Sequence, residues 1–421
     1  MSGPRSSLYT LLRWSEKYTK TDMVYLARGG FWSVLAQIVT ALLVFTFAVI
    51  VAYVLPKEVY GDYKYILALV ALLGTFSLSG LGAAVFQSVA RGYDGALQQG
   101  FWLNLKWSAL AIIGAFALSA YYFLLGNTTL ALGVLVGGSL APLLTSASLS
   151  GVFLNAKKDF ARSSIYFSII ENLLAIGALI LTILLTKNPL IIAIVYFLGN
   201  TLATYWLYRR VIRIYRPDPS KTDPGMLTYA KHLSLMGILS SIAGNIDQVL
   251  VFHFVGPVQL ALYNFAIAIP DQTKGPLKMF NAMLLPKLVN RSDIEVEKGM
   301  RNKMLWLLLS SVLFVLLYGA AAPFIYAFFF PAYRDAAGYS QIYAISTLSI
   351  FFSPAGTYLV AKKKVREQYV STTVLSLLQI GAMLVGVALW GLLGLIVAQI
   401  VIKIGGGLFT YLLYRHAARA S

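Results

Sequence analysis

Long apolar stretches separated by short polar segments dominate the chain, and two of the clearest are residues 36–55 and 305–323. A helix needs roughly 20 mainly apolar residues to cross a hydrocarbon core of about 30 Å, and inside that core it satisfies its own backbone hydrogen bonds. The pattern therefore predicts an all-α polytopic membrane protein. The twelve predicted transmembrane helices are 30–55, 64–88, 102–125, 130–154, 163–186, 189–209, 232–255, 259–285, 303–329, 338–360, 369–389 and 392–414.

The composition agrees with this pattern and excludes several classes of site. Hydrophobic residues make up 58% of the chain and charged residues only 12%, which is too little charge to cover a soluble domain of this size. The absence of cysteine excludes disulfides, thiolate chemistry and cysteine-ligated metals. No cofactor and no metal site is predicted, and no Gly-rich loop of the kind that binds nucleotide phosphates is present.

Basic residues are concentrated in every second loop between the predicted helices. With the N-terminus placed inside, the external loops hold only Lys57, Lys64, Lys187 and Arg334 of the 34 Lys and Arg residues. Because positive charge is retained on the cytoplasmic side, we predict a multi-pass protein of the cytoplasmic membrane with both termini inside. The formal net charge of +18 reflects this bias and attraction to anionic headgroups, so no nucleic-acid partner is expected.

The longest polar segment divides the predicted helices into two sets of six. Residues 213–230 contain several prolines and are predicted to be a cytoplasmic linker between an N-lobe at 28–212 and a C-lobe at 231–421. Residues 1–27 are predicted to form a cytoplasmic segment with an interfacial helix.

An internal repeat indicates that the two halves are related. Residues 55–63 follow the first span and residues 255–263 follow the seventh, and each segment ends on a Tyr that opens the next helix. The predicted fold is thus two pseudo-symmetric six-helix bundles, a layout found in rocking transporters.

Several short motifs resemble a known family. Leu-Pro-Lys-Glu-Val-Tyr-Gly-Asp-Tyr at 55–63, Ser-Gly-Leu-Gly at 79–82 and Gln-Ser-Val-Ala-Arg at 87–91 resemble the first repeat of polysaccharide flippases, and 245–263 resembles the second. This family is the Wzx-like branch of the multidrug/oligosaccharidyl-lipid/polysaccharide exporter superfamily. One departure is Ala261, which stands where the first repeat has Gly61. We expect it to alter turn geometry rather than activity.

The resemblance implies a transporter that carries polyprenyl-linked oligosaccharide or polysaccharide repeat units across the membrane by alternating access. Its expected partners are this lipid-linked oligosaccharide, membrane lipids, a coupling H⁺ or Na⁺, and other polysaccharide biosynthesis proteins. Two alternatives stay open. One is an ion-coupled drug or small-solute antiporter of the same superfamily. The other is a membrane-embedded polymerase or ligase acting on lipid-linked glycans, which is disfavoured because the predicted external loops are too short to hold a catalytic site.

The eighth predicted span carries a group of ionisable residues, which are costly in a bilayer and are therefore functional candidates. Asp271, Lys274 and Lys278 follow Pro270 at spacings that place them on one face of a continuous helix. In the functional interpretation, Lys274 and Lys278 bind the pyrophosphate and acidic sugars of a lipid-linked donor. In the structural alternative, Asp271 neutralises Lys274 while Lys278 extends to the headgroups.

Four more ionisable residues are candidates. Lys403 in span twelve and Arg28 at the mouth of span one are predicted substrate-binding residues, although Arg28 has a second interpretation as a headgroup anchor. Asp247 in the seventh span and Glu171 in the fifth are, like Asp271, coupling or structural carboxylates. For Asp247 we favour the structural role of a hydrogen-bond partner to a neighbouring helix. No catalytic residue is predicted.

Overall fold

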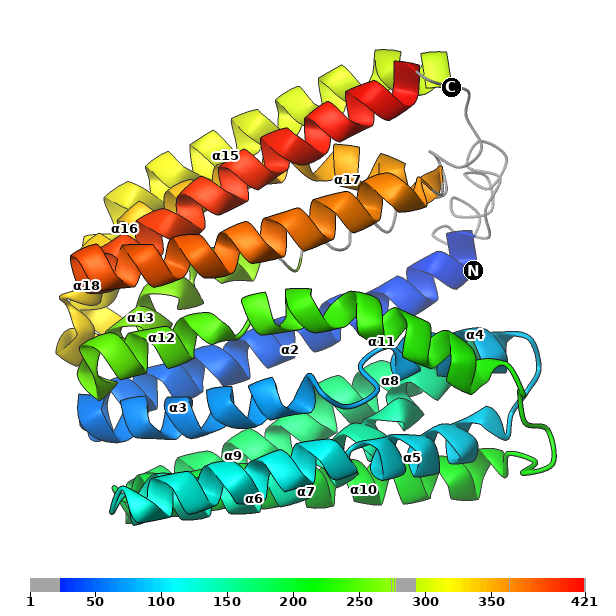
Figure 1. Ribbon diagram of the computed structural model, residues 1–421, viewed down its shortest axis with the longest axis horizontal. Coiled ribbons are helices and arrows are strands. Elements are labelled where there is room, and N and C mark those ends of the chain that lie inside the picture. Colours follow the sequence, from blue (N-terminus) through cyan, green and yellow to red (C-terminus); the bar gives the residue numbers. More distant parts are fainter. Residues whose placement is uncertain (1–22, 274, 276, 278–292, 363, 420–421) are drawn as a thin grey trace, which may run out of the picture. The chain divides into compact units, whose positions relative to one another are not determined.

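The computed structural model describes residues 23–273, 275, 277, 293–362 and 364–419, and every regular element within them is a helix (Figure 1). The α-helices are α2 (Met23–Val54), α3 (Lys57–Gly74), α4 (Leu81–Ala90), α5 (Ala96–Trp107), α6 (Ala109–Leu124), α7 (Thr128–Ala156), α8 (Phe160–Ser163), α9 (Glu171–Leu185), α10 (Pro189–Tyr215), α11 (Met226–Ala243), α12 (Ile246–Val255), α13 (Pro257–Ala268), α15 (Asp293–Phe329), α16 (Ala336–Ala344), α17 (Ser353–Ala361) and α18 (Val365–Arg419). The π-helix is η1 (Ser164–Ile170), and the 3-10 segments are η2 (Pro270–Thr273), η3 (Pro331–Tyr333) and η4 (Ile345–Phe352).

Nine helical stretches of the described residues are long and apolar enough to cross a membrane. One of them, Val365–Ala418, holds both the eleventh and the twelfth predicted spans. The second and eighth predicted spans are the two that the nine stretches leave out. α3 carries four charged residues in its first half, Lys57, Glu58, Asp62 and Lys64. Residues 274, 276 and 278–285 of the eighth span lie outside the described residues. The prediction of an all-helical, multi-pass membrane protein is confirmed.

The second predicted span, 64–88, is wrong as a single helix. α3 ends at Gly74 and α4 begins only at Leu81. The Ser77 hydroxyl donates to the Gly74 carbonyl at 2.6 Å, and a side-chain donor of this kind competes with the helical ladder. The intervening Gly80 N–H donates to the Ser234 hydroxyl of α11 at 2.9 Å, so this break is a packing point.

The chain folds into two compact units. The first contains the described residues of 1–50 and 73–235, and the second contains the described residues of 51–72 and 236–421. These units are defined by packing, whereas the lobes 28–212 and 231–421 were predicted from the linker, so the lobe boundaries stay a prediction. The predicted interfacial helix lies almost wholly in residues 1–22, which are outside the described residues.

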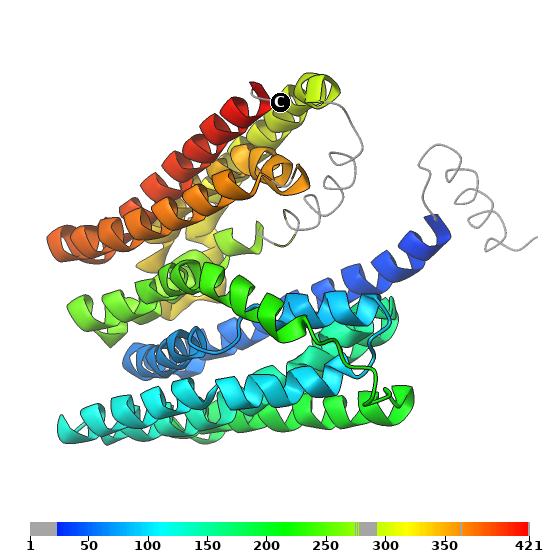
Figure 2. The ribbon, with the colours of Figure 1, turned by 45° about the vertical axis from the view of Figure 1, so that its right-hand side comes forward.

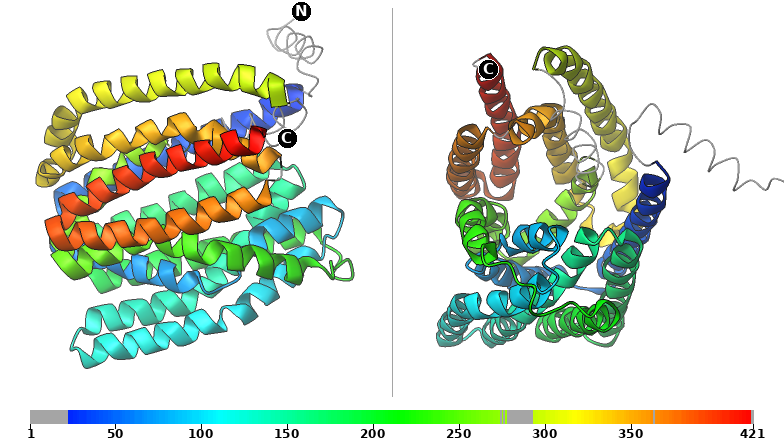
Figure 3. Two further views of the ribbon diagram at one scale, coloured as in Figure 1. Left: turned by 45° about the horizontal axis from the view of Figure 1, so that its top comes forward. Right: turned by 90° about the vertical axis from the view of Figure 1, so that its right-hand side faces the viewer.

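Small residues allow close helix packing in the first unit. α7 packs against α6 and α10, and Figure 3 (left) shows α6 and α7 side by side in cyan and turquoise. A Cβ added at Gly138 of α7 would lie only 2.3 Å from the Cβ of Ala115 in α6. Because lipid supplies little hydrophobic drive between helices, such close van der Waals contact stabilises the pair.

The two repeat segments meet within the second unit. A Cβ added at Gly61 of α3 would lie 2.0 Å from the carbonyl oxygen of Pro257, at the start of α13. Beside this contact, Tyr65 of α3 and Phe252 of α12 stack with their ring centroids 3.6 Å apart. The chain passes from α12 to α13 at Gly256, whose φ of +96° favours glycine. Position 61 therefore needs glycine because of a backbone contact.

α18 consists of two arms joined by a sharp turn. The backbone leaves helical geometry at Trp390 and Gly391, and Gly391 has a φ of +58°. A Cβ added at Gly394 would lie 1.9 Å from the carbonyl oxygen of Gly386 on the other arm. Figure 2 shows the two arms, in orange and red, running side by side from this turn. The turn falls between the eleventh and twelfth predicted spans, as expected.

Candidate functional site

Pro270 interrupts the eighth span, and hydroxyl groups from neighbouring helices satisfy the carbonyls that the interruption leaves. Proline has no N–H to donate to the carbonyl four residues earlier. That carbonyl, of Ala266, instead accepts a hydrogen bond from the Ser340 hydroxyl of α16 at 2.6 Å. The carbonyl before it, of Phe265, accepts one from the Tyr326 hydroxyl of α15 at 2.7 Å. The break is therefore built into the packing of the second unit.

This break corrects the prediction of one continuous helix through Asp271. α13 ends at Ala268 and Asp271 lies in the 3-10 segment η2, so its spacing to Lys274 and Lys278 does not define a helical face. Lys274 and Lys278 themselves lie outside the described residues. The backbone of Arg28 is part of α2, but its side chain also falls outside the described part.

Asp271, Tyr343 and Lys403 form what we call the lysine cluster. The Lys403 ammonium donates to the Tyr343 hydroxyl at 2.6 Å and lies 4.3 Å from the centroid of the same ring. The Tyr343 hydroxyl in turn donates to the Asp271 carboxylate at 3.1 Å. One tyrosine of α16 thus connects a cation of α18 to an anion of η2, and all three side chains are half-buried or buried. The sequence predicted the two charges but not that they share a partner.

Asp247 anchors a second network, which we call the aspartate hub and which contains Asp247, Tyr263 and Gln399. The Asp247 carboxylate of α12 accepts a very short hydrogen bond from the Tyr263 hydroxyl of α13 and one of 3.2 Å from the Gln399 amide of α18. Gln399 also donates to the Tyr263 hydroxyl at 2.6 Å, and the Gln248 N–H donates to the other carboxylate oxygen at 2.9 Å. All three hub side chains are buried. This arrangement satisfies a buried carboxylate, as a membrane interior requires.

Glu171 occupies a different setting in the first unit. It is the first residue of α9, immediately after the π-helix η1, and such π segments are frequent at functional sites. Its carboxylate accepts a hydrogen bond from the Thr204 hydroxyl of α10 at 2.7 Å. One turn earlier on α10, the buried Thr201 hydroxyl has no hydrogen-bond partner among the described residues. Among the residues that the structure describes, Glu171 therefore has one side-chain hydrogen-bond partner where Asp247 has two.

The segment between α10 and α11 carries a charged anchor that the sequence analysis missed. The buried Asp223 carboxylate accepts hydrogen bonds from the Ser88 hydroxyl at 2.6 Å, from Arg91 at 2.8 Å and from the Gly225 N–H at 2.9 Å. Led by the Ser88 bond, these interactions favour the charged form and hold the pKa of the Asp223 carboxyl below its ordinary value, against the opposing effect of burial. The Gln99 amide pairs with the Asp223 backbone. These bonds hold the segment between α10 and α11 against α4, α5 and the turn between them.

Tyr263, Tyr343 and Gln399 are the site residues that sequence reasoning did not find. The chain has 26 tyrosines, so neither tyrosine stands out by its type. Gln399 carried a usable signal, because it is an amide inside an apolar span and such groups commonly bond across helices. Among the described residues, no three His, Cys, Asp or Glu side chains lie close enough together to hold a metal ion.

The overall fold matches exporters of the MOP superfamily. The chain is similar to an inward-facing multidrug resistance MATE family transporter of that superfamily, at 15% identity and a TM-score of 0.71, covering 91% of this chain and 95% of the other. It is also similar to the lipid II flippase MurJ in an inward closed conformation, at 14% identity and a TM-score of 0.65, covering 92% of this chain and 87% of the other. At these identities the likeness establishes the fold alone. No curated protein matches the chain.

The family follows from the sequence itself. A family model described as polysaccharide biosynthesis protein matches residues 26–271, which is more than half of the chain. The chain belongs to this family. The resemblance inferred from 55–63, 79–82, 87–91 and 245–263 is therefore confirmed, and the predicted class of transporter rather than enzyme agrees with this family and this fold.

Proposed function

We propose that this protein flips polyprenyl-linked oligosaccharide or polysaccharide repeat units across the cytoplasmic membrane by alternating access, with both termini cytoplasmic. The observation that carries the proposal is a polysaccharide biosynthesis family match on a chain with an exporter fold. A glycan is too polar to cross a hydrocarbon core unaided, because each polar group that loses water without a new partner costs free energy. A polysaccharide pathway therefore needs a protein that moves its lipid-linked intermediates.

The lysine cluster is the proposed contact for the negative charge of this substrate. The hydroxyl of Tyr343 holds the Lys403 ammonium in place and connects it to Asp271. A phosphate or acidic sugar can displace these contacts because a charge-assisted hydrogen bond to an anion is stronger than one to a neutral hydroxyl. Lys274, Lys278 and Arg28 are proposed as further substrate contacts on the basis of the sequence.

The three carboxylates receive different proposed roles. Asp247 is structural, since donors from α12, α13 and α18 surround it. Asp271 and Glu171 are the proposed coupling carboxylates for H⁺ or Na⁺; Asp271 accepts from the Tyr343 hydroxyl, and Glu171 accepts from the Thr204 hydroxyl. Membrane lipids and other polysaccharide biosynthesis proteins are the remaining proposed partners.

Complementation of a flippase-deficient strain tests this proposal. Surface glycan is measured beside the abundance of the protein in the membrane, for wild type, Lys403→Ala, Lys274→Ala and Lys278→Ala. Losing a charge-assisted contact worth about 1.5–3 kcal/mol should lower transport by roughly tenfold to a hundredfold at normal abundance. The exposed Lys187 supplies the matched control Lys187→Ala, which should behave as wild type. Full activity of Lys403→Ala would remove the lysine cluster from the substrate path.

A drug antiporter is the second candidate, favoured by the similarity to a multidrug resistance MATE transporter. The same strain separates the two functions. If wild type restores no glycan from a matched substrate but raises resistance to cationic drugs, the antiporter replaces the flippase. If wild type restores glycan without changing drug resistance, the antiporter is excluded.

A further inference from the structure

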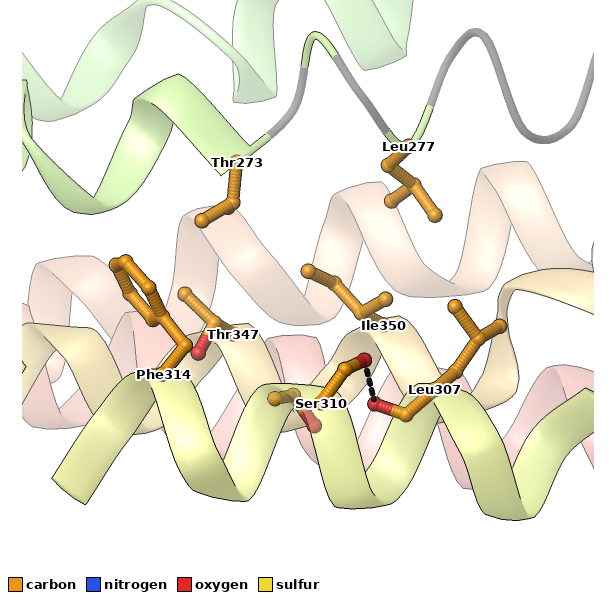
Figure 4. A pocket seen from close by; sticks show the side chains of 8 residues that line it. Thr273, Leu277, Leu307, Ser310, Phe314, Thr347 and Ile350 are labelled. Atoms are coloured by element: carbon orange, nitrogen blue, oxygen red, sulfur yellow. Dashed lines mark hydrogen bonds between the residues drawn. The ribbon is translucent and has the colours of Figure 1, made fainter. Parts of the chain in front are cut away.

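A cavity of about 280 Å³ lies inside the second unit, between η2, α15 and η4 (Figure 4). Figure 4 shows Thr273 and Leu277 on one side, facing α15 and η4 across the space. Large apolar side chains make up half of its lining: Leu277, Leu307, Phe314 and Ile350. This size is close to the lower limit of about 300 Å³ for small-molecule pockets in proteins.

The other lining residues carry hydroxyl groups, but each hydroxyl hydrogen is already used by its own helix or turn. The four bonds are Thr273 Oγ1 to Pro270 O at 2.7 Å, Ser310 Oγ to Leu307 O at 3.0 Å, Ser311 Oγ to Leu308 O at 2.9 Å and Thr347 Oγ1 to Ala344 O at 2.7 Å. None of these hydroxyls therefore has a hydrogen left to donate into the cavity. A phosphate or sugar needs such donors, whereas a hydrocarbon chain does not.

The sequence of α15 gives this helix two distinct faces beside the cavity. The residues of α15 that line the cavity recur at helical spacing: Leu307, Ser310, Ser311 and Phe314. Between them, Leu309 and Leu313 are 61% and 56% exposed and belong to a different face of the helix. α15 thus presents Leu307, Ser310, Ser311 and Phe314 to the cavity, and Leu309 and Leu313 lie on a different face.

Two elements connect the lining of the cavity to the lysine cluster. Thr273 follows Asp271 in the same 3-10 segment, and Thr347 follows Tyr343 by one turn along α16 and η4. A charged region that holds Lys403 therefore adjoins an apolar cavity without free donors. This combination fits an amphiphile that has an anionic head and a hydrocarbon chain.

We propose that the cavity binds an isoprene section of the polyprenyl carrier while the phosphate of the carrier lies at the lysine cluster. This choice of ligand rests on the proposed function, because the polyprenyl chain is the lipid part of the proposed substrate. A cavity of about 280 Å³ can hold a short isoprenoid section, with the ring of Phe314 and the side chain of Ile350 in contact with the chain. The cavity would thereby hold the lipid part of the substrate inside the second unit during transport.

Photo-crosslinking tests the proposal on the full chain in lipid nanodiscs. One arm uses a polyprenyl phosphate with a diazirine in its chain, and the other uses phosphatidylglycerol with a diazirine in its acyl chain. We expect the polyprenyl probe to label α15 or η4 peptides and Ser310→Trp, which fills the cavity, to lower that labelling about tenfold. The matched control is Leu309→Trp, which adds the same side chain on the exposed face and should leave labelling unchanged.

A second measurement does not depend on a bulky variant. Because the chain has no cysteine, Ser310→Cys creates a unique thiol with nearly the volume of serine, and Leu309→Cys is its lipid-facing control. Polyprenyl phosphate should slow modification of the thiol at 310 by N-ethylmaleimide at least about fivefold and leave the thiol at 309 unaffected. Equal protection of both thiols would overturn the proposal.

The two lipid probes distinguish this proposal from the flippase assignment. Equal labelling and equal protection by phosphatidylglycerol would make the cavity a general lipid site and overturn the proposal. Absence of polyprenyl labelling in a protein that restores surface glycan would also overturn it, while the flippase assignment would stand. Specific polyprenyl labelling in a protein that restores no glycan would support the site and count against the flippase assignment.

Discussion

The two compact units hold carboxylates within their membrane-spanning helices in different ways. In the first unit, Glu171 accepts from one side chain, Thr204. In the second unit, Asp247 accepts from Tyr263 and Gln399 and from a backbone N–H. A carboxylate with one hydrogen-bond partner can change that partner by breaking a single bond. A carboxylate that accepts bonds from three helices holds those helices together. This contrast supports the proposal that Glu171 changes state during transport while Asp247 maintains the packing of its unit.

The largest expected effect comes from removing each carboxylate in turn. Asp247→Ala leaves the Tyr263 hydroxyl hydrogen without its acceptor and removes one acceptor of the Gln399 amide, which should lower the free energy of unfolding by about 3–5 kcal/mol. Glu171→Ala frees a single threonine hydroxyl and should cost about 1 kcal/mol. Thermal unfolding of the two purified variants in the same detergent measures the difference. Equal losses of stability would show that the number of partners does not distinguish the two sites.

The next largest effect should separate the two networks within the second unit. Tyr343→Phe removes the hydroxyl between Lys403 and Asp271, and we expect transport to fall about tenfold with little loss of stability. Tyr263→Phe removes a buried donor to Asp247, and we expect a stability loss of about 1–3 kcal/mol with unchanged transport per folded molecule. Surface glycan normalised to the amount of folded protein measures transport, and the unfolding temperature measures stability. A transport defect confined to Tyr263→Phe would reverse the assigned roles.

The smallest expected effect concerns the Asp223 anchor in the first unit. Because the folded pKa of Asp223 lies below its ordinary value, its contribution to stability is complete above the unfolded pKa of about 3.9. That contribution is lost as the pH falls through the lower folded pKa. Asp223→Asn should therefore be less stable than wild type at pH 7 and should lose less stability between pH 5 and pH 2.

Ser88→Ala provides the graded comparison for this prediction. It removes the hydrogen bond that contributes most to the lowered pKa of Asp223, so its loss of stability on acidification should lie between those of wild type and Asp223→Asn. Unfolding temperatures across the pH series measure all three proteins. Identical pH profiles would show that this carboxylate does not contribute through its charge.

The helices were predictable because a long apolar stretch is a property of one segment and needs no partner. The breaks within spans were harder to place. The break between α3 and α4 depends on Ser77 and on contact with α11, and neither is visible in the local hydropathy. The 3-10 segment at Asp271 had a local signal in Pro270, yet its stability depends on hydroxyl groups supplied by α15 and α16.

The sequence predicted individual charged residues of the site but not the contacts between them. Asp247, Asp271 and Lys403 were found because an ionisable residue in an apolar span is conspicuous. Their partners Tyr343, Tyr263 and Gln399 come from other spans, and a single sequence does not state which spans are neighbours. The bonds that join these residues therefore required the three-dimensional arrangement, whereas the charges did not.

The turn at Gly391 has a consequence for how the protein is made. The two arms of α18 run side by side from this glycine, with Gly386 against Gly394. No hydrophilic stretch separates these last two membrane helices. The arms are therefore expected to enter the membrane together as a helical hairpin, and an epitope inserted at Gly391 would interfere with biogenesis before it affected transport.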